Sequence, residues 1–347
     1  MTGMAAAGQK GTFCLTVDNL GEALAVGRGR AARPDPEDQS IRVGVPAFLD
    51  LFADLQLRST FFVEGWNALH HANVIKRIAA AGHEIGLHGW LHEYWAEDLD
   101  DRTREQLLWD GTAALRLAGL NPVAFRAPGG YRGNRTLEAL GELGYRIDSS
   151  IDAGRGAEGE TPELAALPGG IVSIPWTFDM IDHWHYVSAP QGPRHPAAVA
   201  AHWIGLVDAA ADRGGLVTLI VHPFVSGVDH TRMKALRQVL EHAVAHPRIE
   251  VGSAGQVADA FTAGAGGRLA SVHVLPLSRI LGESTPRCVG ASAPLLPSRP
   301  GVPKARSGTS SASRVRDNPR LCSQVKSGRC QQGSRVVSAA SAGFRRG

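Results

Sequence analysis

The sequence has no apolar run as long as about 18 residues, which is the length that a membrane-spanning helix needs, so we expect no membrane partner. Its first residues, MTGMAAAGQKGTF, lack a basic segment followed by a long apolar one. We therefore expect no secretory signal and predict a cytoplasmic protein. Only 4 cysteines occur in 347 residues, and their spacing matches no zinc pattern. Nothing in the sequence requires a disulfide framework.

Acidic residues are almost absent from the last quarter of the chain. Residues 263–347 contain 14 Lys and Arg but only 2 Asp and Glu, whereas residues 1–262 contain 22 basic and 31 acidic residues. Gly, Ser, Pro, Ala and Arg dominate this tail, a composition that cannot bury enough apolar surface to offset the entropy of ordering. We predict a flexible N-terminus over 1–10, a catalytic domain over 11–262 and a disordered basic tail over 263–347. The tail lacks interleaved aromatic residues, so we do not expect a nucleic-acid partner.

The body of the chain alternates short apolar runs with segments of helical periodicity. Strands are predicted at 12–17, 59–63, 84–87, 123–125, 145–148, 171–176 and 216–221, and helices at 45–55, 74–81, 101–117, 135–143, 197–211, 232–245 and 253–261. Such alternation indicates an α/β fold with a parallel sheet. No G-x-G-x-x-G follows the first strand, so a dinucleotide site is not expected. We predict an irregular (β/α) barrel, with the disordered tail outside it.

Polar residues follow most of the predicted strands, which is where a barrel gathers its catalytic groups. His88 and His92 form an H-x-x-x-H pair just after the run 84–87. Two neutral imidazoles and one carboxylate make a metal site that leaves positions open for water and substrate. The spacing alone is weak support, because His242 and His246 share it on a helical segment where we predict only a solvated face.

Five strand-end motifs in one order are far more specific than any single one. They are Thr16-Val17-Asp18-Asn19, His88-x-x-x-His92, Phe125-Arg126-Ala127-Pro128-Gly129, Asp148-Ser149-Ser150 and Leu219-Ile220-Val221-His222-Pro223. Together they resemble the polysaccharide deacetylase family of carbohydrate esterases over about residues 11 to 262. The stretches 175–184 and 222–227 are similar to the branch that includes allantoinase-like amidases and some peptidoglycan deacetylases.

The resemblance implies a metal-dependent hydrolase of non-peptide carbon–nitrogen bonds, which removes acetyl groups from an N-acetylated sugar or a related small amide. One divalent ion is expected, zinc first, with cobalt, nickel or manganese as alternatives. His222 would protonate the leaving amine, and Asp148 would hold His222 in the right tautomer. Arg126 would orient the base carboxylate through a charge-assisted hydrogen bond. The expected partner is a glycan or small-molecule substrate, and the sequence indicates no oligomeric state.

The first strand departs from the family motif, which has two adjacent carboxylates where this chain has Asp18-Asn19. Asp18 could be the base while Asn19 binds the metal through its amide oxygen. Alternatively Asp18 is itself the ligand, and in a register with acids two residues apart Thr16 would occupy the base position. We favour Asp18 as ligand, because a carboxylate binds a dication better than an amide does.

Six further residues are candidates for substrate contact. They are Trp90, Pro128, Gly129, Tyr131, Asp182 and His183. Glycine lets the backbone approach a ligand closely, and tryptophan can stack on a sugar ring. Two other functions remain open at this point: a cyclic-amide hydrolase of the allantoinase kind, and a metal- or carbohydrate-binding relic that has lost its base carboxylate.

Overall fold

The structure is a computed structural model that describes residues 10–95, 99–133, 135–152 and 155–264. The predicted flexible N-terminus and basic tail lie outside these ranges, apart from Lys10, Ala263 and Gly264. Ala263 and Gly264 belong to the last described helix, so the folded part continues two residues beyond the predicted boundary. Within the described ranges, no helix combines the length and apolar character needed to span a membrane.

The described residues build one nine-stranded sheet. Its strands are β1 (Gly11–Asp18), β2 (Thr60–Val63), β3 (Glu84–Leu87), β4 (Ala124–Phe125), β5 (Ile147–Asp148), β6 (Ala165–Leu167), β7 (Ile171–Ser173), β8 (Leu216–Val221) and β9 (Ile249–Gly252). The order is β6-β7-β5-β4-β3-β2-β1-β8, and β9 also pairs with β1. All pairs are parallel except β6 with β7. The strand path ends at β6 and β8, so the predicted barrel is confirmed as a half-barrel.

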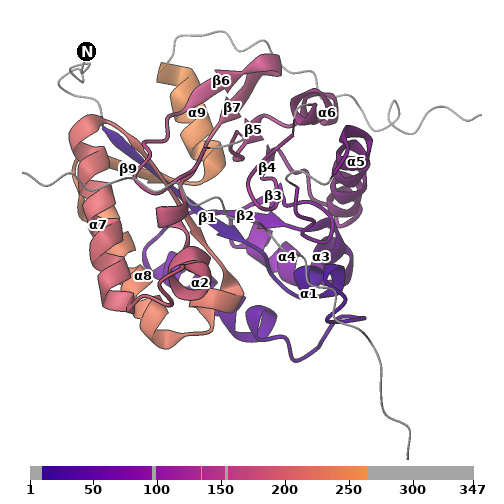
Figure 1. Ribbon diagram of the computed structural model, residues 1–347, viewed down its shortest axis with the longest axis horizontal. Coiled ribbons are helices and arrows are strands. Elements are labelled where there is room, and N and C mark those ends of the chain that lie inside the picture. The colour runs from indigo at the N-terminus through magenta and orange to yellow at the C-terminus, as the bar shows by residue number, and fades with distance from the viewer. Residues whose placement is uncertain (1–9, 96–98, 134, 153–154, 265–347) are drawn as a thin grey trace, which may run out of the picture. The chain divides into compact units, whose positions relative to one another are not determined.

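Nine α-helices lie between the described strands or follow them (Figure 1). They are α1 (Ala23–Gly27), α2 (Val45–Asp54), α3 (Gly65–His70), α4 (Ala72–Ala80), α5 (Asp101–Leu117), α6 (Thr136–Leu143), α7 (Pro196–Arg213), α8 (His230–Ala245) and α9 (Ala254–Gly264). Single helical turns occur at Ser40–Gly44, Pro168–Gly170, Phe178–Met180, Trp184–Ser188 and Pro223–Gly227. Helices α7 and α8 pack against each other, as do α5 and α6.

Local chemistry sets several helix boundaries. The Asp100 side chain accepts a hydrogen bond from the backbone N–H of Thr103 at 2.7 Å, which caps α5 at its N-terminus. Asp229 caps α8 in the same way through the N–H groups of Thr231 and Arg232. Gly144 ends α6 at a φ of 85°, a left-handed conformation that glycine adopts without a Cβ penalty.

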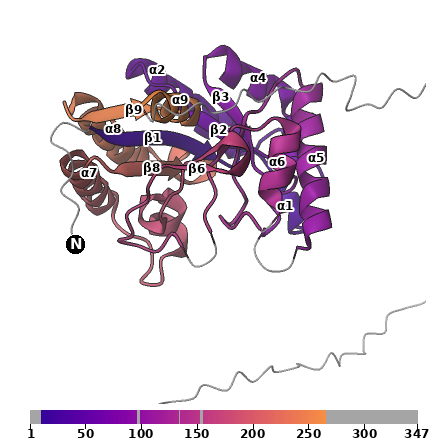
Figure 2. The ribbon, with the colours of Figure 1, turned by 90° about the horizontal axis from the view of Figure 1, so that it is seen from above.

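Alternate side chains of β1 point to opposite faces of the sheet, and each face packs against a separate hydrophobic core. The strand-end polar residues lie on one of these two faces. Phe13, Leu15 and Val17 belong to the main core, which also contains the buried residues of α2, α4, α5, α7 and α8. Cys14 points the other way, into a smaller core with Val257 of α9. Since side chains alternate with a period of two, Asp18 shares the face of Cys14. In Figure 2, β1 runs through the middle of the folded unit with helices around it.

Candidate active site

A pocket of about 200 Å³ opens at the C-terminal ends of the parallel strands. Seventeen residues line it: Asp18, Asn19, Leu24, Arg28, His88, His92, Arg126, Ala127, Gly129, Gly130, Trp176, Phe178, Ile181, His183, Ile220, His222 and Phe224. They come from the ends of β1, β3, β4 and β8, from the segments that follow these strands and β7, and from α1. Parallel strands that end at one edge bring these residues together although they are far apart in the sequence.

Asp18 and Arg126 form a buried ion pair at the floor of this pocket. The guanidinium Nη1 of Arg126 lies 2.7 Å from Asp18 Oδ1, and the two side chains are 1% and 5% exposed. The other oxygen, Oδ2, lies 3.8 Å from His88 Nε2. The ion pair therefore fixes the carboxylate with Oδ2 towards the histidines. This is the contact that the sequence predicted for Arg126, while the catalytic roles of both residues stay predictions.

Several further contacts hold Arg126 in one orientation. Nη1 also donates to Thr16 Oγ1 at 2.9 Å, and Nη2 donates to Ser149 Oγ at 2.7 Å. Nε donates to the Ser149 carbonyl at 3.1 Å. The guanidinium carbon lies 4.2 Å from the centre of the Phe62 ring, a cation–π geometry. A buried charge is tolerated only when it is paired and hydrogen-bonded, and Arg126 meets both conditions.

His88 is oriented by the strand next to its own. Its Nδ1 lies 2.9 Å from the Arg126 carbonyl oxygen, so Nδ1–H donates there and Nε2 carries the lone pair. Burial lowers the pKa of His88 to about 3, so the ring is neutral. A neutral imidazole whose other nitrogen donates to a backbone carbonyl is the usual form of a metal-binding histidine.

His92 lies beside His88 on the loop after β3. The two ring centres are 4.9 Å apart. Gly89 (φ +71°) and His92 itself (φ +59°) take left-handed conformations that turn the chain back towards the pocket. Burial, followed by the nearby His88, lowers the pKa of His92 to about 3. The second H-x-x-x-H pair lies elsewhere, on α8 and its C-cap, where His242 Nε2 is 2.6 Å from Asp208 Oδ1.

In the described part of the chain, His88 and His92 have no carboxylate beside them that completes a metal site. Within the residues that the structure describes, no three His, Cys, Asp or Glu side chains are arranged to hold a metal ion. Asn19 lines the pocket beside Asp18 at a φ of 58° and is nearly buried. Its amide oxygen is thus a candidate third donor beside the two imidazoles.

Asp182 holds His222 on the side of the pocket formed by β8. Asp182 Oδ1 lies 2.6 Å from His222 Nδ1, and Asp182 Oδ2 accepts from the His222 backbone N–H at 2.9 Å and from Ser226 Oγ at 2.6 Å. Burial alone would lower the pKa of His222, but the Asp182 carboxylate outweighs it and raises that pKa. His222 is therefore poised to carry a proton on Nε2.

The prediction that Asp148 holds His222 is wrong. Asp148 is fully buried, but its carboxylate pairs with Arg132 and accepts from the Ser150 backbone N–H at 3.2 Å. The next residue, Ser149, points to Arg126 instead. Because neighbouring side chains in a strand point to opposite faces, Asp148 is turned away from the pocket. The residue that takes its predicted role is Asp182.

The structure divides the other predicted substrate residues into two groups. Gly129 and His183 line the pocket, whereas Trp90, Pro128, Tyr131 and Asp182 are not among its lining residues. The half-buried Trp90 packs over Gly65, where a Cβ would come within 2.6 Å of its ring. Sequence reasoning missed Arg28, Phe178 and Phe224. Arg28 lies in a segment after β1 that is rich in glycine and arginine, and this composition is the sequence signal that could have pointed to it.

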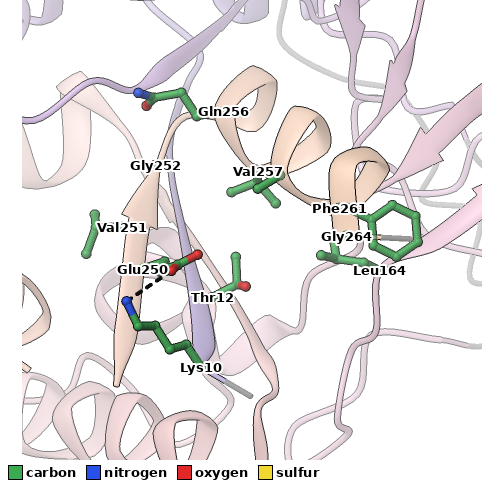
Figure 3. Close-up of a pocket in the computed structure, with 11 residues that line it drawn as sticks. Lys10, Thr12, Leu164, Glu250, Val251, Gly252, Gln256, Val257, Phe261 and Gly264 are labelled. Atoms are coloured by element: carbon green, nitrogen blue, oxygen red, sulfur yellow. Dashed lines mark ion pairs between the residues drawn. The ribbon is translucent and has the colours of Figure 1, made fainter. Parts of the chain in front are cut away.

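A larger hollow lies at the opposite end of the sheet. It measures about 850 Å³ and is formed by the start of β1, by β9 and by α9, with Leu164 and Phe261 on one side (Figure 3). Lys10 and Glu250 form an ion pair on the other side, at 3.1 Å. Its lining includes no histidine. We therefore place the chemistry in the smaller pocket, which holds the strand-end residues.

Comparison with known proteins shows which proteins this chain is similar to. Residues 37–147 match the family model for polysaccharide deacetylase. The chain is 31% identical over 101 residues to a peptidoglycan-N-acetylglucosamine deacetylase of Bacillus cereus, covering 29% of this chain and 47% of the relative. It is 32% identical over 109 residues to a peptidoglycan deacetylase of Helicobacter pylori, covering 31% and 37%. The matches thus span less than half of these relatives.

Solved structures extend the similarity over most of the described residues. A protein of Mycobacterium smegmatis assigned to the polysaccharide deacetylases superposes with a TM-score of 0.64 at 28% identity, covering 76% of this chain and 94% of that one. The allantoinase PuuE superposes with a TM-score of 0.60 at 21% identity, covering 74% and 92%, and this second likeness concerns the fold alone. The family model, the relatives and the fold together confirm the predicted resemblance to the polysaccharide deacetylase family.

Proposed function

We propose that this protein hydrolyses the amide bond of an N-acetylated sugar or a related small acyl amide. The observation that carries the proposal is one pocket lined by Asp18 and His222, each held by a buried partner of opposite charge. A carboxylate can accept a proton from water and an imidazolium can donate one to a leaving group, so the two side chains supply a base and an acid in one pocket. The similarity to peptidoglycan deacetylases supports the choice of an acyl amide. The cytoplasmic location stays a prediction.

In this mechanism Asp18 and His222 move protons in opposite directions. Asp18 takes a proton from water, and the water oxygen adds to the acyl carbon. The carbon–nitrogen bond then breaks, and the leaving nitrogen takes a proton from His222 Nε2. The products are a carboxylic acid and a free amine. Asp182 stabilises the imidazolium before that transfer, because its carboxylate lies 2.6 Å from Nδ1.

The geometry favours Asp18 as base over Asp18 as metal ligand. Oδ1 is held by Arg126 at 2.7 Å, which keeps the carboxylate oriented for proton transfer. Thr16 cannot replace it, since its Oγ1 donates to the Leu219 carbonyl at 2.8 Å and accepts from Arg126, and its side chain is fully buried. We thus prefer the first of the two alternatives that the sequence left open.

We propose that His88, His92 and the Asn19 amide oxygen would hold a divalent metal ion. The neutral imidazoles fit such an ion, and Asn19 supplies the oxygen that no third described His, Cys, Asp or Glu provides. When bound, the ion would lower the pKa of water and polarise the acyl carbonyl. Zinc is the first choice for two nitrogens and an oxygen, with cobalt, nickel or manganese as alternatives.

The direct test is product formation by the full chain on a panel of amides. N-acetylglucosamine, its β-1,4-linked oligomers and a cyclic ureide are incubated with the protein in the presence of zinc, cobalt, nickel or manganese. We expect acetate and free amine in equal amounts from an N-acetyl sugar. We also expect His88→Ala to lose both activity and bound metal, whereas His230→Ala, which changes an exposed histidine on α8, keeps both.

Three other results of this test would contradict the proposal. Turnover of the ureide without release of acetate would replace the deacetylase proposal by a cyclic-amide hydrolase. Metal binding that depends on His88 but without turnover of any panel member would favour a binding relic. Activity of His88→Ala equal to that of the unaltered protein would contradict the metal site.

A further inference from the structure

Arg28 is a cation at the pocket, and no acidic side chain among the described residues pairs with it. It follows α1 as its C-cap residue, and its backbone N–H donates to the Leu24 carbonyl at 3.2 Å. Its side chain is exposed and lines the pocket. No hydrogen bond or ion pair of this guanidinium occurs among the residues that the structure describes. The catalytic proposal does not use Arg28.

The charges that line the pocket do not cancel. Asp18 is the only acidic residue among the lining residues, and Arg126 neutralises it at 2.7 Å. Arg28 is therefore an uncompensated positive charge at the pocket. His183 also lines the pocket, and its pKa is lowered chiefly by burial and then by the nearby His222. Asp182 raises the pKa of His183, whereas the positive charge of Arg28 lowers it.

The backbone before Arg28 is seated against the loop that carries His92. A Cβ at Gly27 would come within 2.7 Å of the Leu91 carbonyl oxygen, so only glycine allows this close approach. Leu91 immediately precedes His92. The contact therefore sets the position of Arg28 relative to the histidines, rather than leaving it on a detached surface loop.

From this placement we propose that the substrate carries an anionic group, a phosphate or a carboxylate, and that Arg28 binds it while the acyl amide lies between Asp18 and His222. The inference rests on the proposed amide hydrolysis and names its substrate class. Guanidinium matches the two oxygens of a phosphate or carboxylate in a bidentate geometry. A pocket of about 200 Å³ accommodates one sugar-sized unit, so the anionic group belongs to the unit whose amide is cleaved.

The test compares one neutral and two acidic ligands that share an N-acetyl group. These are N-acetylglucosamine, N-acetylglucosamine 6-phosphate and N-acetylmuramic acid, which distinguish phosphate from carboxylate. The variants are Arg28→Ala, Arg28→Lys and the matched control Arg30→Ala. Arg30 lies on the same loop and is exposed, but it does not line the pocket. Dissociation constants are measured by titration calorimetry and kcat/KM by release of acetate.

We expect the unaltered protein to prefer at least one acidic ligand. Arg28→Ala should weaken binding of the acidic ligand relative to N-acetylglucosamine by about tenfold, because one charge-assisted contact at a partly exposed site is lost. The ratio of kcat/KM for the acidic ligand to kcat/KM for N-acetylglucosamine should fall by the same factor. Arg28→Lys should recover part of this loss, and Arg30→Ala should leave both ratios within about twofold of the original, as for surface changes away from a site.

The calorimetry separates this inference from the proposed function. If acidic ligands bind through Arg28 but release no acetate, hydrolysis fails and anion recognition stands. If acetate is released and Arg28→Ala matches Arg30→Ala, hydrolysis stands and the inference is overturned. Failure of both acidic ligands to bind better than N-acetylglucosamine to the unaltered protein would also overturn it.

Discussion

Replacement of Asp18 with Asn is expected to lower kcat for an N-acetylated sugar by about 10²- to 10⁴-fold, the range that a positioned general base contributes. The amide of Asn cannot accept the proton of the attacking water. The backbone at position 18 is unaffected by this change, because β1 pairs there with β2 through Phe62. Steady-state release of acetate measures the effect, and circular dichroism checks that the variant is folded.

The metal content of the same variant distinguishes base from ligand. If Asp18 is the base, Asp18→Asn keeps its metal and loses turnover. If Asp18 is the ligand, metal and turnover are lost together. Asp152→Asn serves as the control, because Asp152 is 72% exposed and lies outside the pocket. A kcat for Asp18→Asn within about tenfold of the original would show that another group is the base.

Replacement of Arg126 with Met is expected to lower the free energy of unfolding by about 3–5 kcal/mol, the usual cost of leaving a buried charge without its partner. Arg126 is 1% exposed and Asp18 is 5% exposed, so solvent cannot compensate the carboxylate. The change also removes the donors to Ser149 Oγ and Thr16 Oγ1. Urea unfolding followed by circular dichroism measures the loss.

Two further variants make this prediction specific. The double variant Arg126→Met with Asp18→Asn should be more stable than Arg126→Met alone, since no buried charge is left unpaired. Arg135→Ala should change the free energy of unfolding by less than about 0.5 kcal/mol, because Arg135 is 65% exposed and forms a surface ion pair with Glu138. A loss below about 1 kcal/mol for Arg126→Met would contradict the buried pair as the element that fixes Asp18.

The long, strongly patterned elements could be predicted from sequence because local signals define them. The strand at β8 and the helices at α5 and α8 lie within a few residues of their predicted bounds. Strand β9 was missed because Ile249–Gly252 is short, and only its pairing with β1 makes it a strand. Strand β6 is absent from the predicted strands for the same reason, since it consists of three residues at the edge of the sheet.

The site shows the same division between local and long-range information. Asp18, His88, Arg126 and His222 lie together because each follows or ends a parallel strand, and strand ends are visible in the sequence. The partner of His222 was not visible. Strand β5 has two residues, too few for alternation to show which way Asp148 points. Asp182 reaches His222 through a bridge between Ile181 and Ile220, which only the folded chain reveals.

The central claim is that His222, protonated and held by Asp182, acts opposite Asp18, and the pH dependence of kcat/KM tests it most directly. Because Asp182 raises the pKa of His222, the unaltered protein should stay active above pH of about 6.5, the ordinary value for histidine, and lose activity only as the pH rises further. Asp182→Asn should move this loss to lower pH, while Asp148→Asn, which changes the carboxylate paired with Arg132, should not. An alkaline limb that stays in place in Asp182→Asn, or that moves only in Asp148→Asn, would contradict the account.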